Sequence, residues 1–195
     1  MSFLLIARND RLNPSRRAFL GESGLMLSAS AIALLAGCDV LAADQKNSDG
    51  AGAHDVAILN SALASEREAI AAYQLGADSG LLEPGVKIVA LKFQGHHKAH
   101  ADLLAATVSK LGGHPVEARK KYDFPTDKLK SQADVLRFAA QLEQGAVSAY
   151  LGAVPAFGNR DLARAAASIL GDEAMHLAIL RNVLGEDPVP AAFVG

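Results

Sequence analysis

Apolar side chains recur at intervals of three and four residues along four separate stretches of the chain. These stretches run from about residue 54 to 78, from about 86 to 111, from about 131 to 154 and from about 161 to 184. Such spacing places side chains on one face of an α-helix, so each stretch predicts an amphipathic helix. Strand-type runs of Val, Ile and Thr are missing, and we therefore expect an all-α fold.

Proline and glycine separate the four stretches. They stand at Pro84, Gly112, Gly113, Pro155, Gly158, Gly185 and Pro188. Short turns join the first stretch to the second and the third to the fourth, so each pair predicts an antiparallel hairpin.

The connection between the hairpins, residues 113–130, is much longer than the other two. A helix of about 25 residues is roughly 38 Å long, and about 18 extended residues reach up to roughly 60 Å. The connection can therefore cross the whole bundle and place the third helix parallel to the second. The alternative is a loop that only decorates the surface.

The two hairpins are internal copies of each other. "SEREAIAAY" (65–73) matches "LEQGAVSAY" (142–150), and "GHHKAHADLL" (95–104) matches "GDEAMHLAIL" (171–180). The repeat aligns polar or aromatic residues on the apolar stripes in four pairs: Glu66 with Glu143, Tyr73 with Tyr150, His97 with Glu173, and His100 with His176.

The copied polar residues have the chemistry of metal ligands. Residues at i and i+3 share a helix face, so His97 and His100 converge on one region, as do Glu173 and His176. The first and third helices each add one Glu. Carboxylates and imidazoles that face a bundle core are costly unless they are paired or bound to metal. The alternative is a metal-free bundle whose polar residues pair among themselves.

Composition and charge narrow the class of protein. The 195 residues are half hydrophobic, enough for one domain with a sizeable core. The formal net charge is −2 at pH 7 without a basic patch, so we expect no nucleic-acid partner. Cys38 is the only cysteine, which excludes an internal disulfide.

The first 37 residues predict a targeting segment. Arg16 and Arg17 precede a modestly apolar run, which resembles a twin-arginine export signal. "LLAGC" at 34–38 resembles a lipobox, whose Cys38 would carry lipid at the mature N-terminus. We therefore expect a periplasmic protein anchored by lipidated Cys38, and Asp39 beside it favours the inner membrane.

Two alternatives stay open for this segment. Cleavage after Ala42 or Ala43 would give a soluble periplasmic protein, and the run 18–37 is long enough to consider as a transmembrane anchor. Under the lipoprotein interpretation, residues 38–53 form a flexible tether, 54–184 the bundle and 185–195 a C-terminal tail.

The whole pattern resembles the ferritin-like superfamily, and within it exported bacterial ferritin-like domain proteins that carry twin-arginine signals. Its di-iron and di-manganese carboxylate members take one Glu from each of two helices and Glu-x-x-His from each of the other two. The resemblance covers residues 54–184 and implies a four-helix bundle with a di-iron carboxylate-like metal site. Iron is the implied metal, with zinc, manganese and copper as alternatives.

Position 97 departs from the family pattern. The family has a Glu there, which usually bridges the two metals, whereas this chain has His97. A neutral imidazole binds one metal through one nitrogen. The three remaining Glu residues do not balance two divalent ions, so we expect a nitrogen-rich site that favours Zn, Cu or Ni over Mn. A single ion, or two unequal ions, stays open.

The resemblance also assigns ligands for the case in which two ions bind. Glu66 and His100 would hold one ion, Glu143 and His176 the other, with Glu173 as the bridge and His97 as an extra terminal ligand on the first.

Other candidates have plainer expectations. His96 lies opposite Asp172 in the repeat, and we expect it to be solvated or to contact a ligand instead of the metal; sharing a metal with His100 is the alternative. Glu68 is expected on a solvated face, or as an alternative carboxylate. We expect Tyr73 and Tyr150 to be core packing residues, with redox relays as the alternative. We expect His54 and His114 to be ordinary helix-start and loop residues.

The expected function is the binding of one or two transition-metal ions in the bundle core. If the protein is catalytic, the chemistry would be oxidation of metal or disposal of peroxide or oxygen, a role in oxidative stress. The rival is a non-enzymatic, metal-binding or metal-free structural module of the cell envelope. We do not expect a storage cage, because residues 185–195 leave no room for another long helix and a lipid tether would hinder a closed shell. A homodimer stays open.

Export should depend on the arginine pair. Replacing Arg16 and Arg17 with Lys should leave unprocessed precursor in the cytoplasm, measured by fractionation and immunoblotting. Replacing Arg8 and Arg11 with Lys is the matched control and should not change processing. Normal processing of the first variant would contradict the twin-arginine interpretation.

Overall fold

The computed structural model describes residues 48–194, which contain four long helices and two short 3₁₀ turns. The elements are α2 (Ser48–Asp78), α3 (Pro84–Lys110), η1 (Thr126–Lys128), α4 (Gln132–Ala153), η2 (Val154–Ala156) and α5 (Arg160–Val183). No strand occurs among the described residues, so the expected all-α fold is confirmed. The residues on which the export and lipidation predictions rest, Arg16, Arg17 and Cys38, lie outside the described residues.

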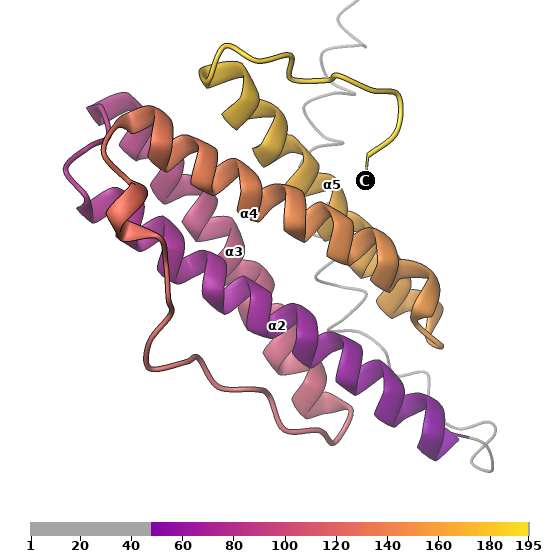
Figure 1. Cartoon of the computed structure of the whole chain (residues 1–195). Coiled ribbons are helices and arrows are strands. Elements are labelled where there is room, and N and C mark those ends of the chain that lie inside the picture. The colour runs from indigo at the N-terminus through magenta and orange to yellow at the C-terminus, as the bar shows by residue number, and fades with distance from the viewer. Residues whose placement is uncertain (1–47, 195) are drawn as a thin grey trace, which may run out of the picture.

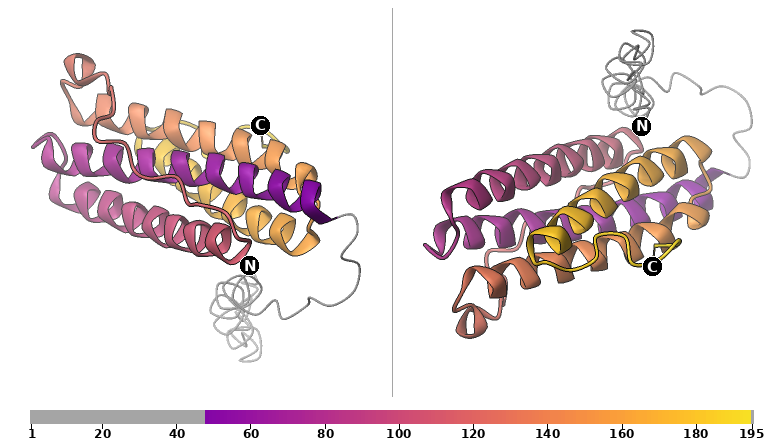
Figure 2. Two further views of the ribbon diagram at one scale, coloured as in Figure 1. Left: turned by 90° about the horizontal axis from the view of Figure 1, so that it is seen from below. Right: turned by 90° about the horizontal axis from the view of Figure 1, so that it is seen from above.

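The four helices form a bundle of two hairpins. α2 packs antiparallel on α3, and α4 packs antiparallel on α5 (Figure 1). Residues 111–131 run back along the length of the bundle, so that α4 lies parallel to α3 (Figure 2). The long connection therefore crosses the bundle as its length predicts.

The helix ends follow from local chemistry. Pro84 occupies the first turn of α3, where a missing N–H costs nothing. The side chains of Ser131 and Asn159 accept hydrogen bonds from the first turns of α4 and α5. Gly112 and Gly185 follow α3 and α5 with φ angles of 78° and 76°, a left-handed conformation that favours glycine.

α2 begins earlier than the apolar pattern predicts. It starts at Ser48, not near residue 54, so residues 48–53, expected as part of the tether, are helical. Extending an existing helix fixes one residue for each added hydrogen bond, and this segment contains no proline to prevent it.

A polar layer divides the apolar core into two parts. One end of the bundle is filled by Leu59, Leu63, Ala101, Leu104, Val108, Leu162 and Ala165, and the other by Tyr73, Phe93, Leu136 and Leu180. The residues between them on the same helix faces are Glu and His. None of the helices in residues 48–194 has the length and apolarity to cross a membrane.

Asp55 ties the start of α2 to the loop before α5. Its carboxylate is buried and accepts hydrogen bonds from the backbone N–H groups of Gly158 (2.8 Å) and Asn159 (3.0 Å). Asn159 is itself the N-cap of α5, so this contact positions the whole helix. Hydrogen bonds to a charged group are among the stronger ones in proteins.

Asp55→Ala should therefore lower the free energy of unfolding by about 2 kcal/mol, because it leaves two backbone donors without their acceptor. Urea unfolding followed by circular dichroism, with chelator present throughout, measures this effect. Asp102→Ala, on the exposed face of α3, is the control and should change stability by less than about 0.5 kcal/mol. Equal stability of the two variants would contradict the role given to Asp55.

Candidate metal centre

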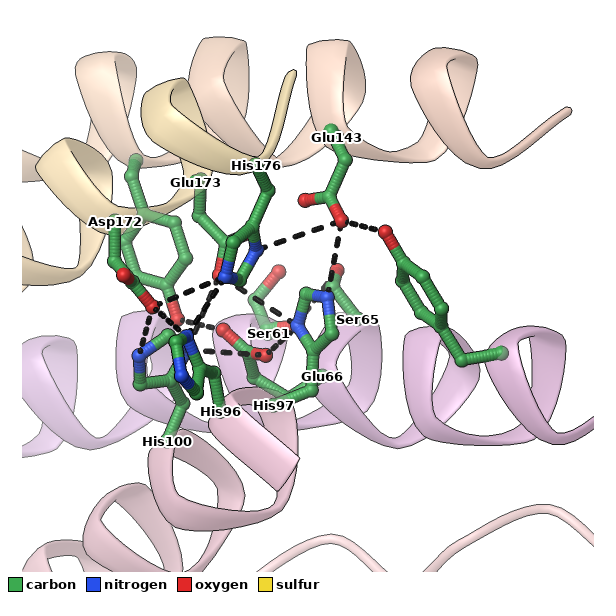
Figure 3. A network of polar contacts seen from close by, with 12 residues as sticks. Ser61, Ser65, Glu66, His96, His97, His100, Glu143, Asp172, Glu173 and His176 are labelled. Carbon is green, nitrogen blue, oxygen red and sulfur yellow. Dashed lines mark hydrogen bonds and ion pairs between the residues drawn. The ribbon is translucent and has the colours of Figure 1, made fainter. Parts of the chain in front are cut away.

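The structure brings together all six sequence-predicted ligands in the polar layer (Figure 3). Five of them are at most 2% exposed: Glu66, His97, Glu143, Glu173 and His176. The sixth, His100, has a side chain that is 14% exposed. Their positions follow from the internal repeat, which places one ligand on each of α2 and α4 and two ligands on each of α3 and α5.

The six residues form two overlapping groups. The first consists of Glu66, His97, His100 and Glu173, and the second of His97, Glu143, Glu173 and His176. Within each group the ligand atoms all lie within 4.8 Å of one another. Glu173 belongs to both groups, which is the position expected of a bridging carboxylate.

His97 also belongs to both groups. Its Nδ1 lies 2.8 Å from Oε2 of Glu66, and its Nε2 lies 3.3 Å from Oε1 of Glu143. The expectation placed His97 on the first ion alone, whereas the ring stands between the carboxylates of α2 and α4. The difference arises because an imidazole carries nitrogens on two sides of one ring.

Several buried ligand atoms have no hydrogen-bond partner. They are both carboxylate oxygens of Glu173, Oε2 of Glu143, and Nδ1 of His100 and of His176. Some of these atoms face an opposite charge, since Nδ1 of His100 lies 3.1 Å from Oε1 of Glu173 and Nδ1 of His176 lies 3.5 Å from Glu143 and Glu173. These contacts are ion pairs and not well-formed hydrogen bonds, and burying polar atoms without hydrogen bonds is costly. All five are carboxylate oxygens or imidazole nitrogens, which are ligand atoms for transition metals. The residues present therefore fit a metal centre.

Two tyrosines connect the repeats in a crossed pattern. The hydroxyl of Tyr73 on α2 donates to Glu143 on α4, and that of Tyr150 on α4 donates to Glu66 on α2 at 2.6 Å. Both tyrosines are buried as expected of core residues, but they also hold a candidate ligand each. The sequence carries the signal, because each Tyr follows a Glu by seven residues, two turns along the same helix face.

The imidazoles hold protons strongly when no metal is present. Burial lowers the pKa of His97, but hydrogen bonds to Glu143 and Glu66 outweigh it and raise the pKa to about 10. Burial also lowers the pKa of His100, but its interactions with Asp172 and Glu173 outweigh burial and raise the pKa to about 11. For His176, the interactions with Glu143 and Glu173 outweigh burial and raise the pKa to about 9.

The pKa values of the three buried carboxylates shift in two directions. Burial opposes ionisation of Glu66, but its hydrogen bonds to His100 and His97 lower the pKa. Glu143 has its pKa lowered in the same way by His176 and His97. Burial dominates at Glu173 and raises its pKa. The metal-free layer is therefore an ion-pair network of imidazolium and carboxylate groups.

His96 and Asp172 stand beside this layer. Nδ1 of His96 lies 3.0 Å from Oδ2 of Asp172 and 2.9 Å from Nε2 of His176. Oδ2 of Asp172 lies 3.3 Å from Nε2 of His176 and 3.4 Å from Nε2 of His100. His96 thus contacts a candidate ligand, one of its two expected roles. Asp172 was not among the predicted site residues, although the repeat places it opposite His96.

The remaining candidates are peripheral. His114 is exposed in the loop after α3, as expected. His54 is also exposed, but it lies within α2 and not at the helix start, because α2 begins at Ser48. Glu68 is half-buried at the wall of a cavity beside the centre and belongs to neither group of ligands.

Comparison with known proteins places the fold. The family model for the ferritin-like domain matches residues 54–186. No curated protein matches the chain.

The solved structures that are similar to the chain include the following three. A conserved hypothetical protein from Mycobacterium tuberculosis has 29% sequence identity and a TM-score of 0.64, with 73% of this chain and 98% of that chain covered. A Desulfovibrio desulfuricans bacterioferritin, described with a diiron site, has 21% identity and a TM-score of 0.66, with 72% and 83% covered. A ferritin-like, diiron-carboxylate protein from Bacillus anthracis has 22% identity and a TM-score of 0.60, with 68% and 96% covered.

The raised histidine pKa values predict how stability depends on pH. Without metal, the folded state holds protons on imidazoles that the unfolded state releases above their ordinary pKa of 6.5. The resulting stabilisation is complete below that value and is lost as pH rises through about 9 and beyond, at about 1.4 kcal/mol per pH unit for each extra proton held. Chelator-treated protein should therefore melt at a lower temperature at pH 9 than at pH 7.

Metal-loaded protein is the control for this measurement. Metal ligation requires neutral imidazoles, so loading should remove the fall in melting temperature between pH 7 and pH 9. A metal-free melting temperature that stays level or rises over this range would contradict the proton network.

Proposed function

Because the chain belongs to the ferritin-like domain family, we propose that its polar layer binds one or two transition-metal ions. The observation that carries the proposal is the set of buried carboxylate oxygens and imidazole nitrogens without hydrogen-bond partners. Hydrogen bonds within the protein leave these atoms unsatisfied, whereas a bound cation would satisfy them together. The residues that contact these ligands, such as Tyr73 and Tyr150, would then hold them in place.

The two groups of ligands suggest how the ions are held. Glu66 and His100 would hold one ion and Glu143 and His176 the other, and Glu173, which belongs to both groups, would be shared between them. His97 lies between Glu66 and Glu143 and can serve one of the two ions through one nitrogen at a time. The two ions would therefore have unequal sets of ligands. This supports two ions of different affinity, or a single ion.

Charge supports a nearly balanced site for two divalent ions. The three Glu residues supply three negative charges. Asp172 adds a fourth from outside the layer, because its pKa is lowered to about 2 by its hydrogen bond to His100, against the effect of burial. A carboxylate that accepts from a ligating imidazole also fixes the orientation of the ring. Asp172 therefore partly replaces the charge that His97 removes from the family pattern.

Iron is the metal that the similar proteins suggest. The bacterioferritin and the Bacillus anthracis protein are both described as diiron proteins. Three imidazoles and three carboxylates suit iron but also zinc and copper, and are less suited to manganese. We propose iron as the resident metal and zinc as its strongest competitor.

A cavity of about 500 Å³ gives small molecules a route to the layer. It lies between α2 and α4, and Glu66, His97 and Glu143 are among the residues that line it. Small residues, including Ser61, Ser65, Gly145, Ala146 and Ala149, form much of its walls. The route suits metal ions, oxygen and peroxide.

The proposed activity is oxidation of metal or removal of peroxide or oxygen. A bound redox-active ion would supply the electrons for such chemistry. Tyr73 and Tyr150 keep Glu143 and Glu66 aligned, and burial together with those carboxylates raises both tyrosine pKa values well above the ordinary range. The phenols therefore stay protonated and act as hydrogen-bond donors. A non-enzymatic metal-binding module of the cell envelope is the alternative.

We also propose that the bundle works in the periplasm at the inner membrane. The support is the sequence around Arg16, Arg17 and Cys38. The tether would then hold the bundle close to the membrane surface.

His97→Glu should shift the centre toward iron. It adds a fourth carboxylate at the position where the family has a bridge, so iron should rise toward two ions per chain. Exposure of the iron-loaded protein to air should strengthen absorption in the near ultraviolet. Metal analysis and optical spectra measure both effects. His97→Gln is the control, because it removes the imidazole without adding a charge.

Glu173→Ala tests the same centre from the other direction. Bound metal at 100 times its dissociation constant stabilises a fold by about 2.7 kcal/mol. Chelator should therefore lower the melting temperature of the wild type, and much less that of Glu173→Ala. A wild type that holds no metal after loading, and whose melting temperature does not respond to chelator, would refute the proposed function.

A further inference from the structure

Three ligand atoms meet on the side of His176 that faces away from Glu143 (Figure 3). They are Nδ1 of His96, Oδ2 of Asp172 and Nε2 of His176. Their separations are 3.0 Å from His96 to Asp172, 2.9 Å from His96 to His176, and 3.3 Å from His176 to Asp172. The buried groups use a different nitrogen of His176, because its Nδ1 lies 3.5 Å from both Glu143 and Glu173.

Hydrogen bonds alone do not satisfy this triangle of atoms. An ionised carboxylate only accepts, so both imidazole nitrogens would have to donate to Asp172. Two N–H groups would then face each other across the 2.9 Å between His96 and His176. If only one nitrogen donates, a single proton must serve two sides of the triangle. A cation at the centre receives a lone pair from all three atoms and removes the conflict.

The size and exposure of the triangle suit a small divalent ion. Tetrahedral zinc has bonds of about 2.0–2.1 Å, which places its ligand atoms roughly 3.3 Å apart. The observed separations of 2.9, 3.0 and 3.3 Å come close to this value. The side chains of His96 and Asp172 are 35% and 23% exposed, so water can reach the ion and complete its coordination.

We propose that His96, Asp172 and His176 form an outer cation site, separate from the buried layer, that takes a late first-row divalent ion such as Zn²⁺. Two imidazoles and one carboxylate select such ions over Mg²⁺ and Ca²⁺, which prefer oxygen ligands. The outer site and the buried centre share the ring of His176. A neutral imidazole has one free lone pair, so the outer ion binds more weakly when the buried centre holds Nδ1.

Zinc titration of the purified full chain tests the proposal. We expect the wild type to bind a tighter and a weaker class of Zn²⁺, counted by equilibrium dialysis with metal analysis. His96→Ala should lose the weaker class and keep the tighter one, because His96 belongs to neither of the two buried groups of ligands. His114→Ala, which removes an exposed imidazole elsewhere, is the control and should keep both classes.

Glu173→Ala separates this proposal from the proposed function. It should lose the tighter class and keep the weaker one, since Glu173 is not part of the triangle. Anomalous diffraction at the zinc edge should then place the remaining ion between His96 and Asp172. Equal zinc counts in wild type and His96→Ala, or no zinc at all in Glu173→Ala, would overturn the outer site. A wild type that binds only the weaker class of Zn²⁺ would instead count against the buried centre alone.

Discussion

The burial of Glu66, Glu143 and Glu173 in one layer of the core is the constraint on which the rest of the structure depends. Three carboxylates in an apolar bundle must be neutralised by positive charge. The surrounding imidazoles can do this by holding protons, as their raised pKa values show. Metal ions can do it as well, once those protons leave. Protons and metal ions can therefore neutralise the same carboxylates, one in place of the other. Apolar clusters cover the layer toward both ends of the bundle.

The internal repeat gives this layer an approximate symmetry. The symmetry holds for α2 and α4 but is broken between α3 and α5. The crossed contacts of Tyr73 with Glu143 and of Tyr150 with Glu66 keep the two repeats equivalent on α2 and α4. On the other two helices, α3 carries His where α5 carries an acid, at the positions of His97 and Glu173 and of His96 and Asp172. α3 therefore supplies nitrogen and α5 supplies negative charge. An asymmetric layer of this kind favours unequal ion sites over a symmetric pair.

Periodicity and the repeat were sufficient to predict the four helices, the crossover and the six residues of the layer. The reason is that each of these features depends on spacing within one helix or on the length of one connection. The position of His97 between Glu66 and Glu143, and the role of Asp172, depend instead on how four helices approach one another. The early start of α2 at Ser48 was not predictable from an apolar stripe, because its first residues are small and polar.

The ring of His176 links the buried layer to the outer triangle, and its chemistry sets a limit on both. Nδ1 faces Glu143 and Glu173, whereas Nε2 faces His96 and Asp172. Phe93 stacks on the ring with centroids 4.0 Å apart, which restricts its rotation. A neutral imidazole can bind a metal through only one of these nitrogens, while the other carries the proton. Occupation of one side therefore weakens the other, and an ion held by His96 and Asp172 is positioned to compete with the buried centre for a shared ligand. In this arrangement the two histidines that α3 carries where α5 has an acid serve different sites, because His97 belongs to the buried layer and His96 to the outer triangle.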